Sequence, residues 1–69
     1  MKNKFNTRLT ELRLENNISR TELAHKLKIS VRLVSYWENG KRECSFDTLI
    51  ELADILSTTV DYLLGRTEY

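Results

Sequence analysis

Two closely spaced helix-start signals, at Ser19 and Ser30, constrain the fold of this chain most strongly. The run Ser19–Glu22 reads SRTE, a capping box in which the serine hydroxyl and the glutamate carboxylate satisfy each other's backbone amides. Ser30 caps the following helix, so that only Lys28 and Ile29 are left to connect the two segments. A connection this short is typical of the turn in a helix-turn-helix. Because Asn39-Gly40 favours a helix end, we predict this motif over residues 19–40.

Hydrophobic residues at helical spacing predict three further helices. The first follows a cap at Asn6, the fourth a cap at Ser45 and the last a cap at Thr59, with Gly65 as its end. Their expected buried positions are Phe5, Leu9, Leu12, Leu49, Leu52, Ala53, Leu56, Val60 and Leu63. The chain is therefore predicted to be all-α, with five helices in a single domain over residues 1–69 and a C-terminal tail, residues 66–69, that frays.

Composition argues against several classes of function. The chain has 69 residues with one Cys and one His, whereas metal sites usually need several ligands at fixed spacing. No set of residues suggests catalysis, so we expect no enzyme activity, no cofactor, no metal and no small-molecule substrate. The apolar runs are too short to cross a membrane, and no secretion signal is evident. We expect a cytoplasmic protein, and the lone Cys44 agrees with a reducing compartment.

Charge is distributed unevenly along the chain. Residues 1–42 carry ten Lys or Arg and four Glu, a net charge of +6, whereas residues 43–69 carry one Arg and six acids, a net charge of −5. A protein that presents one basic face to a polyanion commonly has this polarity. The pattern favours nucleic acid as the partner.

The second helix of the motif has two distinct faces. At 100° per residue, Val34 and Trp37 point to one side, and the expected DNA-reading side chains, Val31, Arg32, Ser35 and Tyr36, spread over the other. A helix-turn-helix places this helix in the major groove of double-stranded DNA. There Arg32 can donate two hydrogen bonds to guanine O6 and N7, and Val31 can meet a thymine methyl group.

Residues at the helix ends are the candidates for phosphate contacts. Ser19 and Arg20 open the first helix of the motif, where free backbone amides and the helix dipole favour an anion. Asn39, Lys41 and Arg42 follow the second helix and are expected to bind the strand that flanks the groove. For each of these side chains the alternative is a solvated surface residue.

From about Arg8 to Gly65 the sequence resembles the phage-repressor or XRE-type helix-turn-helix domains, a lambda-repressor-like fold of five helices. The matching runs are RLTELR, ISRTELAHKLKIS, VSYWENGKR and LIELADILSTTVDYLLG. The resemblance implies a sequence-specific transcription regulator, in our reading a repressor, that binds a palindromic operator as a homodimer. It also implies an interhelical ion pair between Arg13 and Glu38, and DNA-facing positions for Arg20, Val31, Arg32, Tyr36 and Asn39.

Three positions depart from the family pattern. Arg20 stands where Gln is usual, which replaces a neutral phosphate contact with a charged one. Lys28 stands where the turn usually has Gly, so the turn either strains a non-glycine residue or takes another path. Cys44 stands where Pro is common before the cap of the fourth helix.

Two further alternatives concern protein partners. The same fold can act as an interaction module, for example an antitoxin-like domain, and Val31, Leu33 and Tyr36 would supply its apolar surface. A homodimer contact would draw on apolar residues outside the main buried stripe: Ile50, Ile55, Tyr62 and Leu64.

Overall fold

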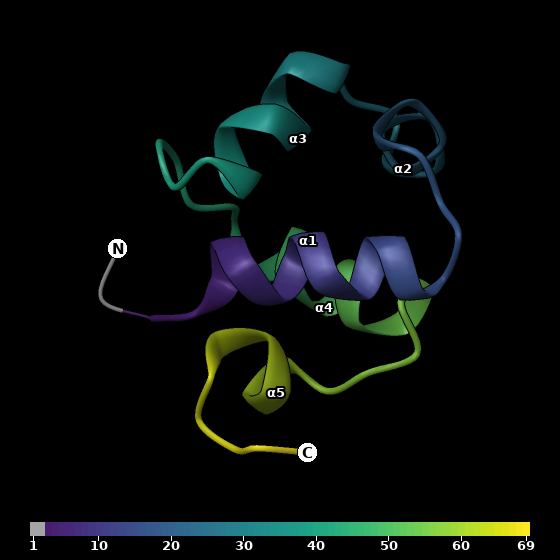
Figure 1. Cartoon of the computed structure of the whole chain (residues 1–69). Coiled ribbons are helices and arrows are strands. Elements are labelled where there is room, and N and C mark those ends of the chain that lie inside the picture. The colour runs from purple at the N-terminus through teal and green to yellow at the C-terminus, as the bar shows by residue number, and fades with distance from the viewer. Residues whose placement is uncertain (1–2) are drawn as a thin grey trace.

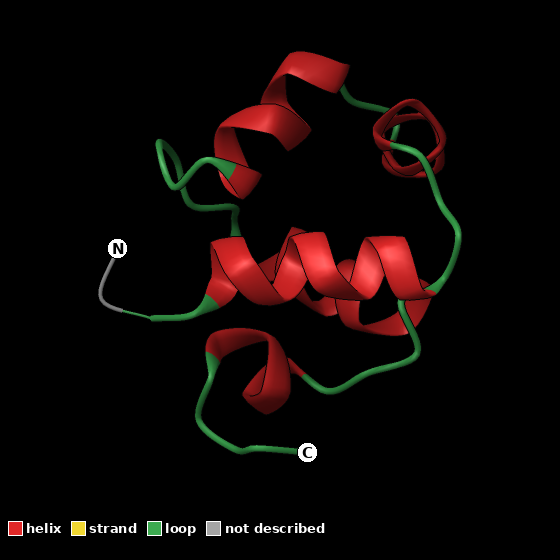
Figure 2. Cartoon of the chain, in the orientation of Figure 1, coloured by secondary structure: helices red, strands yellow, loops and turns green. Residues whose placement is uncertain are grey.

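The computed structural model describes residues 3–69, and all of its regular structure is helical (Figure 2). The helices are α1 (Phe5–Glu15), α2 (Arg20–Leu27), α3 (Val31–Glu38), α4 (Phe46–Ile55) and α5 (Val60–Leu64). This confirms the predicted all-α class and the five helices. None of these helices in residues 3–69 is long and apolar enough to cross a membrane.

Most of the predicted caps are present. Ser19 and Glu22 form the full capping box at the start of α2, and the side chains at the N-caps of α3, α4 and α5 each accept a backbone N–H from inside their helix. The predicted cap at Asn6 is wrong. Helix α1 begins at Phe5, whose backbone N–H donates to Oδ1 of Asn3 at 3.0 Å, so an earlier asparagine binds the first free amide.

Helix α1 lies in the middle of the molecule and organises the packing around it (Figure 1). Helices α2 and α3 lie on one side of α1, α4 lies behind it, and α5 covers the opposite side (Figure 1). The core is formed by Phe5, Leu9, Leu12, Leu23, Ala24, Val34, Trp37, Leu49, Leu52, Ala53, Leu56 and Leu63. Of the buried positions predicted for the first, fourth and last helices, only Val60 is half-buried.

The turn between α2 and α3 holds a non-glycine residue in the left-handed region. Lys28 has φ 59° and ψ 43°, in the left-handed region, and its backbone N–H bonds to the carbonyl oxygens of Ala24 and His25. Ile29 donates to the carbonyl of Ala24 at 3.0 Å, which completes the helix end. Of the two paths open to this turn, the chain therefore adopts the strained one.

A buried ion pair joins α1 to the end of α3, as the resemblance to helix-turn-helix domains implies. Arg13 donates from Nε to Oε2 of Glu38 at 2.7 Å and from Nη2 to Oε1 at 3.3 Å. Burial by itself would raise the pKa of the Glu38 carboxyl, but hydrogen bonds and charges from Arg13 and Arg20 outweigh it and lower the pKa below 4.5. Glu38 therefore stays ionised at neutral pH.

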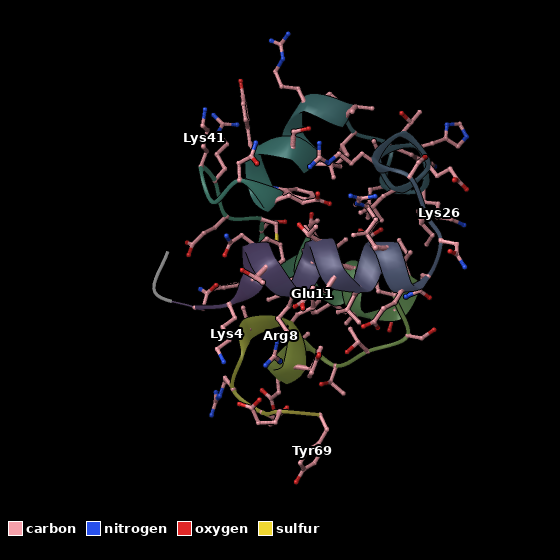
Figure 3. All side chains as sticks on the ribbon, in the orientation of Figure 1. Lys4, Arg8, Glu11, Lys26, Lys41 and Tyr69 are labelled. Carbon is pink, nitrogen blue, oxygen red and sulfur yellow. The ribbon has the colours of Figure 1, made fainter. Side chains whose placement is uncertain are left out.

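The burial of Arg8 was not predicted. Its Nη1 donates to the carbonyl oxygens of Tyr62 at 2.8 Å and Thr67 at 3.0 Å, and its guanidinium lies 4.0 Å from the centre of the Tyr62 ring. Glu68 adds a carboxylate 3.7 Å from Nη2. The C-terminal tail, residues 66–69, was expected to fray, but Arg8 attaches it to α1. Figure 3 labels Arg8 at this position.

We predict that Lys28→Gly stabilises the protein. Glycine removes the strain of a non-glycine residue in the left-handed region, although it also adds entropy to the unfolded chain, so the net gain should be about 1 kcal/mol. Equilibrium denaturation in urea measures it. Lys28→Ala keeps the Cβ and is the matched control, which should show no gain; equal stability of the Gly and Ala variants would contradict the strain.

We predict that Glu38→Gln lowers the free energy of unfolding by about 3 kcal/mol at neutral pH, because it leaves a buried arginine without its counter-charge. The folded pKa of Glu38 is depressed, so its contribution is present above the ordinary value of 4.5 and is lost as pH falls through the folded pKa. Unfolding curves of the two proteins should converge below pH 4.5. Glu51→Gln, at an exposed position on α4, is the control. A gap of constant size at every pH would exclude this role for the carboxylate.

Candidate nucleic-acid interface

Helix α3 buries one face and presents the other to solvent. Val34 and Trp37 are 0% and 2% exposed, and the Phe5 ring meets the Trp37 ring edge-on at 6.4 Å. Val31 is 40% exposed and Arg32 is also exposed, whereas Ser35 and Tyr36 are half-buried. The four predicted DNA-reading side chains, here called the reading face, therefore lie on the side of α3 that faces solvent. Helix α3 lies at the outer edge of the molecule (Figure 1).

The chain folds back after α3 and brings two cations next to the C-terminal end of this helix. Lys41 and Arg42 each donate a backbone N–H to the carbonyl of Tyr36, at 2.9 and 3.4 Å. Gly40, with φ 74°, permits the reversal. The Arg42 guanidinium then lies 5.9 Å from the centre of the Tyr36 ring. Arg42, a predicted phosphate contact, thus lies near Tyr36, a predicted base contact. Both lie beside the end of α3, where Figure 3 labels Lys41.

A side chain from the start of α2 reaches the same end of α3. The Ser19 hydroxyl accepts the Glu22 backbone N–H at 3.0 Å, so its oxygen serves the helix cap. Arg20, the first residue of α2, donates from Nε to Oε1 of Glu38 at 2.9 Å while 43% of its side chain remains exposed. Sequence reasoning assigned Arg20 to phosphate and missed this contact with Glu38, since only the packing of α2 against α3 creates it.

The five predicted phosphate residues therefore fall into two groups. Ser19 and Arg20 form one at the start of α2, and Asn39, Lys41 and Arg42 form the other after α3; apart from the Arg20–Glu38 contact, all of these side chains are exposed to solvent. The arrangement offers a protruding helix with cations at one end, a shape suited to a groove between two phosphate strands.

Cys44 adds no reactive group to this surface. It is half-buried, and burial raises the pKa of its thiol to about 11. The thiol is therefore protonated at neutral pH, a state that is a poor nucleophile and a poor metal ligand.

Comparisons with known proteins agree with the geometry. The chain is 44% identical over 59 residues to the transcriptional regulator AnsR of Bacillus subtilis, 36% identical over 61 residues to the regulator ImmR of the same organism, and 34% identical over 64 residues to the transcriptional activator BcrR of Enterococcus faecalis. These alignments cover 86%, 88% and 93% of this chain but 51%, 48% and 31% of the relatives. The chain thus spans about half of the length of AnsR and ImmR and a smaller share of BcrR.

A solved structure, that of a transcriptional regulator from Listeria innocua, superposes with a TM-score of 0.88 at 25% identity, over 100% of this chain and 64% of that one. Residues 9–63, which include the whole of the α2–turn–α3 unit, match the helix-turn-helix family. The chain belongs to this XRE-type helix-turn-helix family, as the resemblance in its sequence predicts.

Proposed function

We propose that this protein binds double-stranded DNA at a specific sequence and regulates transcription. In this proposal α3 enters the major groove and α2 crosses the phosphate backbone beside it. The observation that carries it is the two-faced α3: Trp37 is 2% exposed, whereas Arg32 is exposed on the opposite side. The names of the relatives as transcriptional regulators support the same role.

Four side chains are proposed to read base edges. Arg32 would donate two hydrogen bonds to one guanine, a contact that discriminates against other bases by about 1–3 kcal/mol. Val31 suits a thymine methyl group, and Ser35 and Tyr36 suit hydrogen bonds to a base or to a nearby phosphate. Only Arg32 has the forked donor geometry that distinguishes one base pair from the other three.

Five residues are proposed to contact phosphates. Lys41 and Arg42 supply full charges after α3, and Asn39 supplies a polar side chain next to them. Ser19 and Arg20 mark the start of α2, where the helix dipole adds a partial positive charge. These contacts set affinity and register, whereas the α3 face sets specificity.

Regulation follows from occupancy of the operator. We propose that the protein acts as a repressor, in the cytoplasm, without a catalytic step, and as a homodimer on a palindromic site. One relative, BcrR, is named an activator, so the direction of regulation is part of the proposal.

Selection from a random duplex library tests the proposal directly. We expect one palindromic sequence to be enriched and its affinity to fall with salt, by about 0.9 in log affinity per log salt for each phosphate contacted. A library without enrichment, or binding that ignores salt, would overturn the proposal. A protein partner that stays bound after Arg20, Arg32 and Lys41 are neutralised together would then support the interaction module.

On the selected duplex, Arg32→Ala and Lys41→Ala should differ in kind. Arg32→Ala should relax the preference at one base pair, whereas Lys41→Ala should weaken all sequences alike and reduce the salt slope by about 0.9. Lys26→Ala is the matched control. Lys26 and Lys41 lie on opposite sides of the molecule (Figure 3), so the substitution of Lys26 should leave DNA binding unchanged. Equal losses from Arg32→Ala on every sequence would remove it from the reading role.

The dimer is tested separately by sedimentation. Ile50 on α4 is 55% exposed, and half-buried Ile55, Tyr62 and Leu64 complete the proposed face. We expect Ile50→Glu to convert a dimer to a monomer, because it places a charge in an apolar contact. Leu14→Glu, at a residue of α1 that is 60% exposed, should leave the mass unchanged. A wild-type monomer, or equal effects of both substitutions, would contradict this face.

A further inference from the structure

The Glu38 carboxylate receives hydrogen bonds from arginines on two different helices. Arg13 of α1 donates to both of its oxygens, at 2.7 and 3.3 Å, and Arg20 of α2 donates from Nε to Oε1 at 2.9 Å. The Glu38 side chain is 1% exposed and that of Arg13 is 10% exposed, whereas the Arg20 side chain is 43% exposed. The cluster therefore runs from the interior to the surface, and Arg20 is its surface end.

The two arginines have different parts in this cluster. Arg13 uses all three of its nitrogens, because Nη1 also donates to the carbonyl of Ile18 at 3.0 Å. It already neutralises the carboxylate inside the protein. Arg20 consequently adds a second positive charge to a site that holds one negative charge.

The contact to Glu38 engages only one edge of the Arg20 guanidinium. Arg20 makes this hydrogen bond through Nε. Because its side chain is partly exposed, the terminal N–H groups can donate to an acceptor outside residues 3–69. Phosphate accepts such paired donors well. The guanidinium also stands at the first residue of α2, where the helix dipole favours an anion.

We propose that Glu38 is a positioning residue for DNA binding: it holds Arg20 by Nε so that the terminal N–H groups face a backbone phosphate. This rests on the proposed function and deepens it. The arrangement ties the phosphate contact of α2 to the C-terminal end of α3, so that the backbone contact and the reading helix keep one fixed relation. Gln at position 20 would lack both the charge and the fork that this arrangement uses.

Holding a long side chain in place before binding reduces the ordering cost that binding otherwise carries. The expected benefit is about fivefold in affinity, which corresponds to one immobilised side chain. A competing possibility gives the opposite sign: if Glu38 withheld Arg20 from the phosphate, removal of the carboxylate charge would tighten binding.

A double-mutant cycle with the full chain on the selected duplex distinguishes these cases. We expect Glu38→Gln to weaken binding about fivefold with the salt slope unchanged, because the Arg20 charge remains. Arg20→Gln should lower the salt slope by about 0.9, and adding Glu38→Gln to it should have little further effect. All variants are compared under conditions in which circular dichroism shows them folded.

Arg20→Lys leaves the buried Arg13–Glu38 pair intact. It therefore tests the positioning role of Glu38 even if the Glu38→Gln variant does not fold. Lysine keeps the positive charge but lacks the Nε donor and the paired terminal N–H groups of arginine. The salt slope should therefore stay as in wild type, while the affinity for DNA falls about fivefold. The positioning role is overturned by tighter binding of Glu38→Gln, by additive losses in the cycle, or by Arg20→Lys binding as wild type does. Absence of salt-dependent binding by the wild-type protein would instead remove the proposed function itself.

Discussion

The rest of the structure depends on the burial of Val34 and Trp37 in the core, where Trp37 packs on Phe5 of α1. A helix of eight residues has little stability of its own, so α3 exists because one of its faces is inside the core. Helical periodicity then leaves the opposite face, with Arg32, no place except solvent. The same packing step that stabilises the domain thus creates the protruding surface to which we assign DNA recognition.

Electrostatics fix the end of this helix rather than contribute much net stability. A buried carboxylate carries a large desolvation penalty, and a paired one returns only part of it. The Glu38 cluster fixes the positions of α1, α2 and the end of α3 relative to one another, because Arg13 and Arg20 bind the same carboxylate from different helices. In a domain whose turn already strains Lys28, such a fixed point keeps the crossing of α2 and α3 well defined.

Features set by short-range rules were predictable from the sequence. The capping box at Ser19, the buried face with Trp37 and the end at Gly65 all depend on neighbours along the chain. The burial of Arg8 and the contact of Arg20 with Glu38 were not predictable, since their partners lie 54 and 18 residues away in sequence and are brought near only by packing. The cap of α1 was misplaced because Asn3 and Asn6 both suit a helix start, and pattern alone did not distinguish them. The roles assigned to the DNA-facing residues stay predictions.

Amide chemical shifts recorded while the selected duplex is added would locate the DNA-binding surface of the protein. We expect the largest changes at the start of α2 and from Val31 to Arg42, with small changes over α4. Shifts concentrated on α4 and α5, with α3 unaffected, would contradict the assignment of α3 as the element that enters the groove.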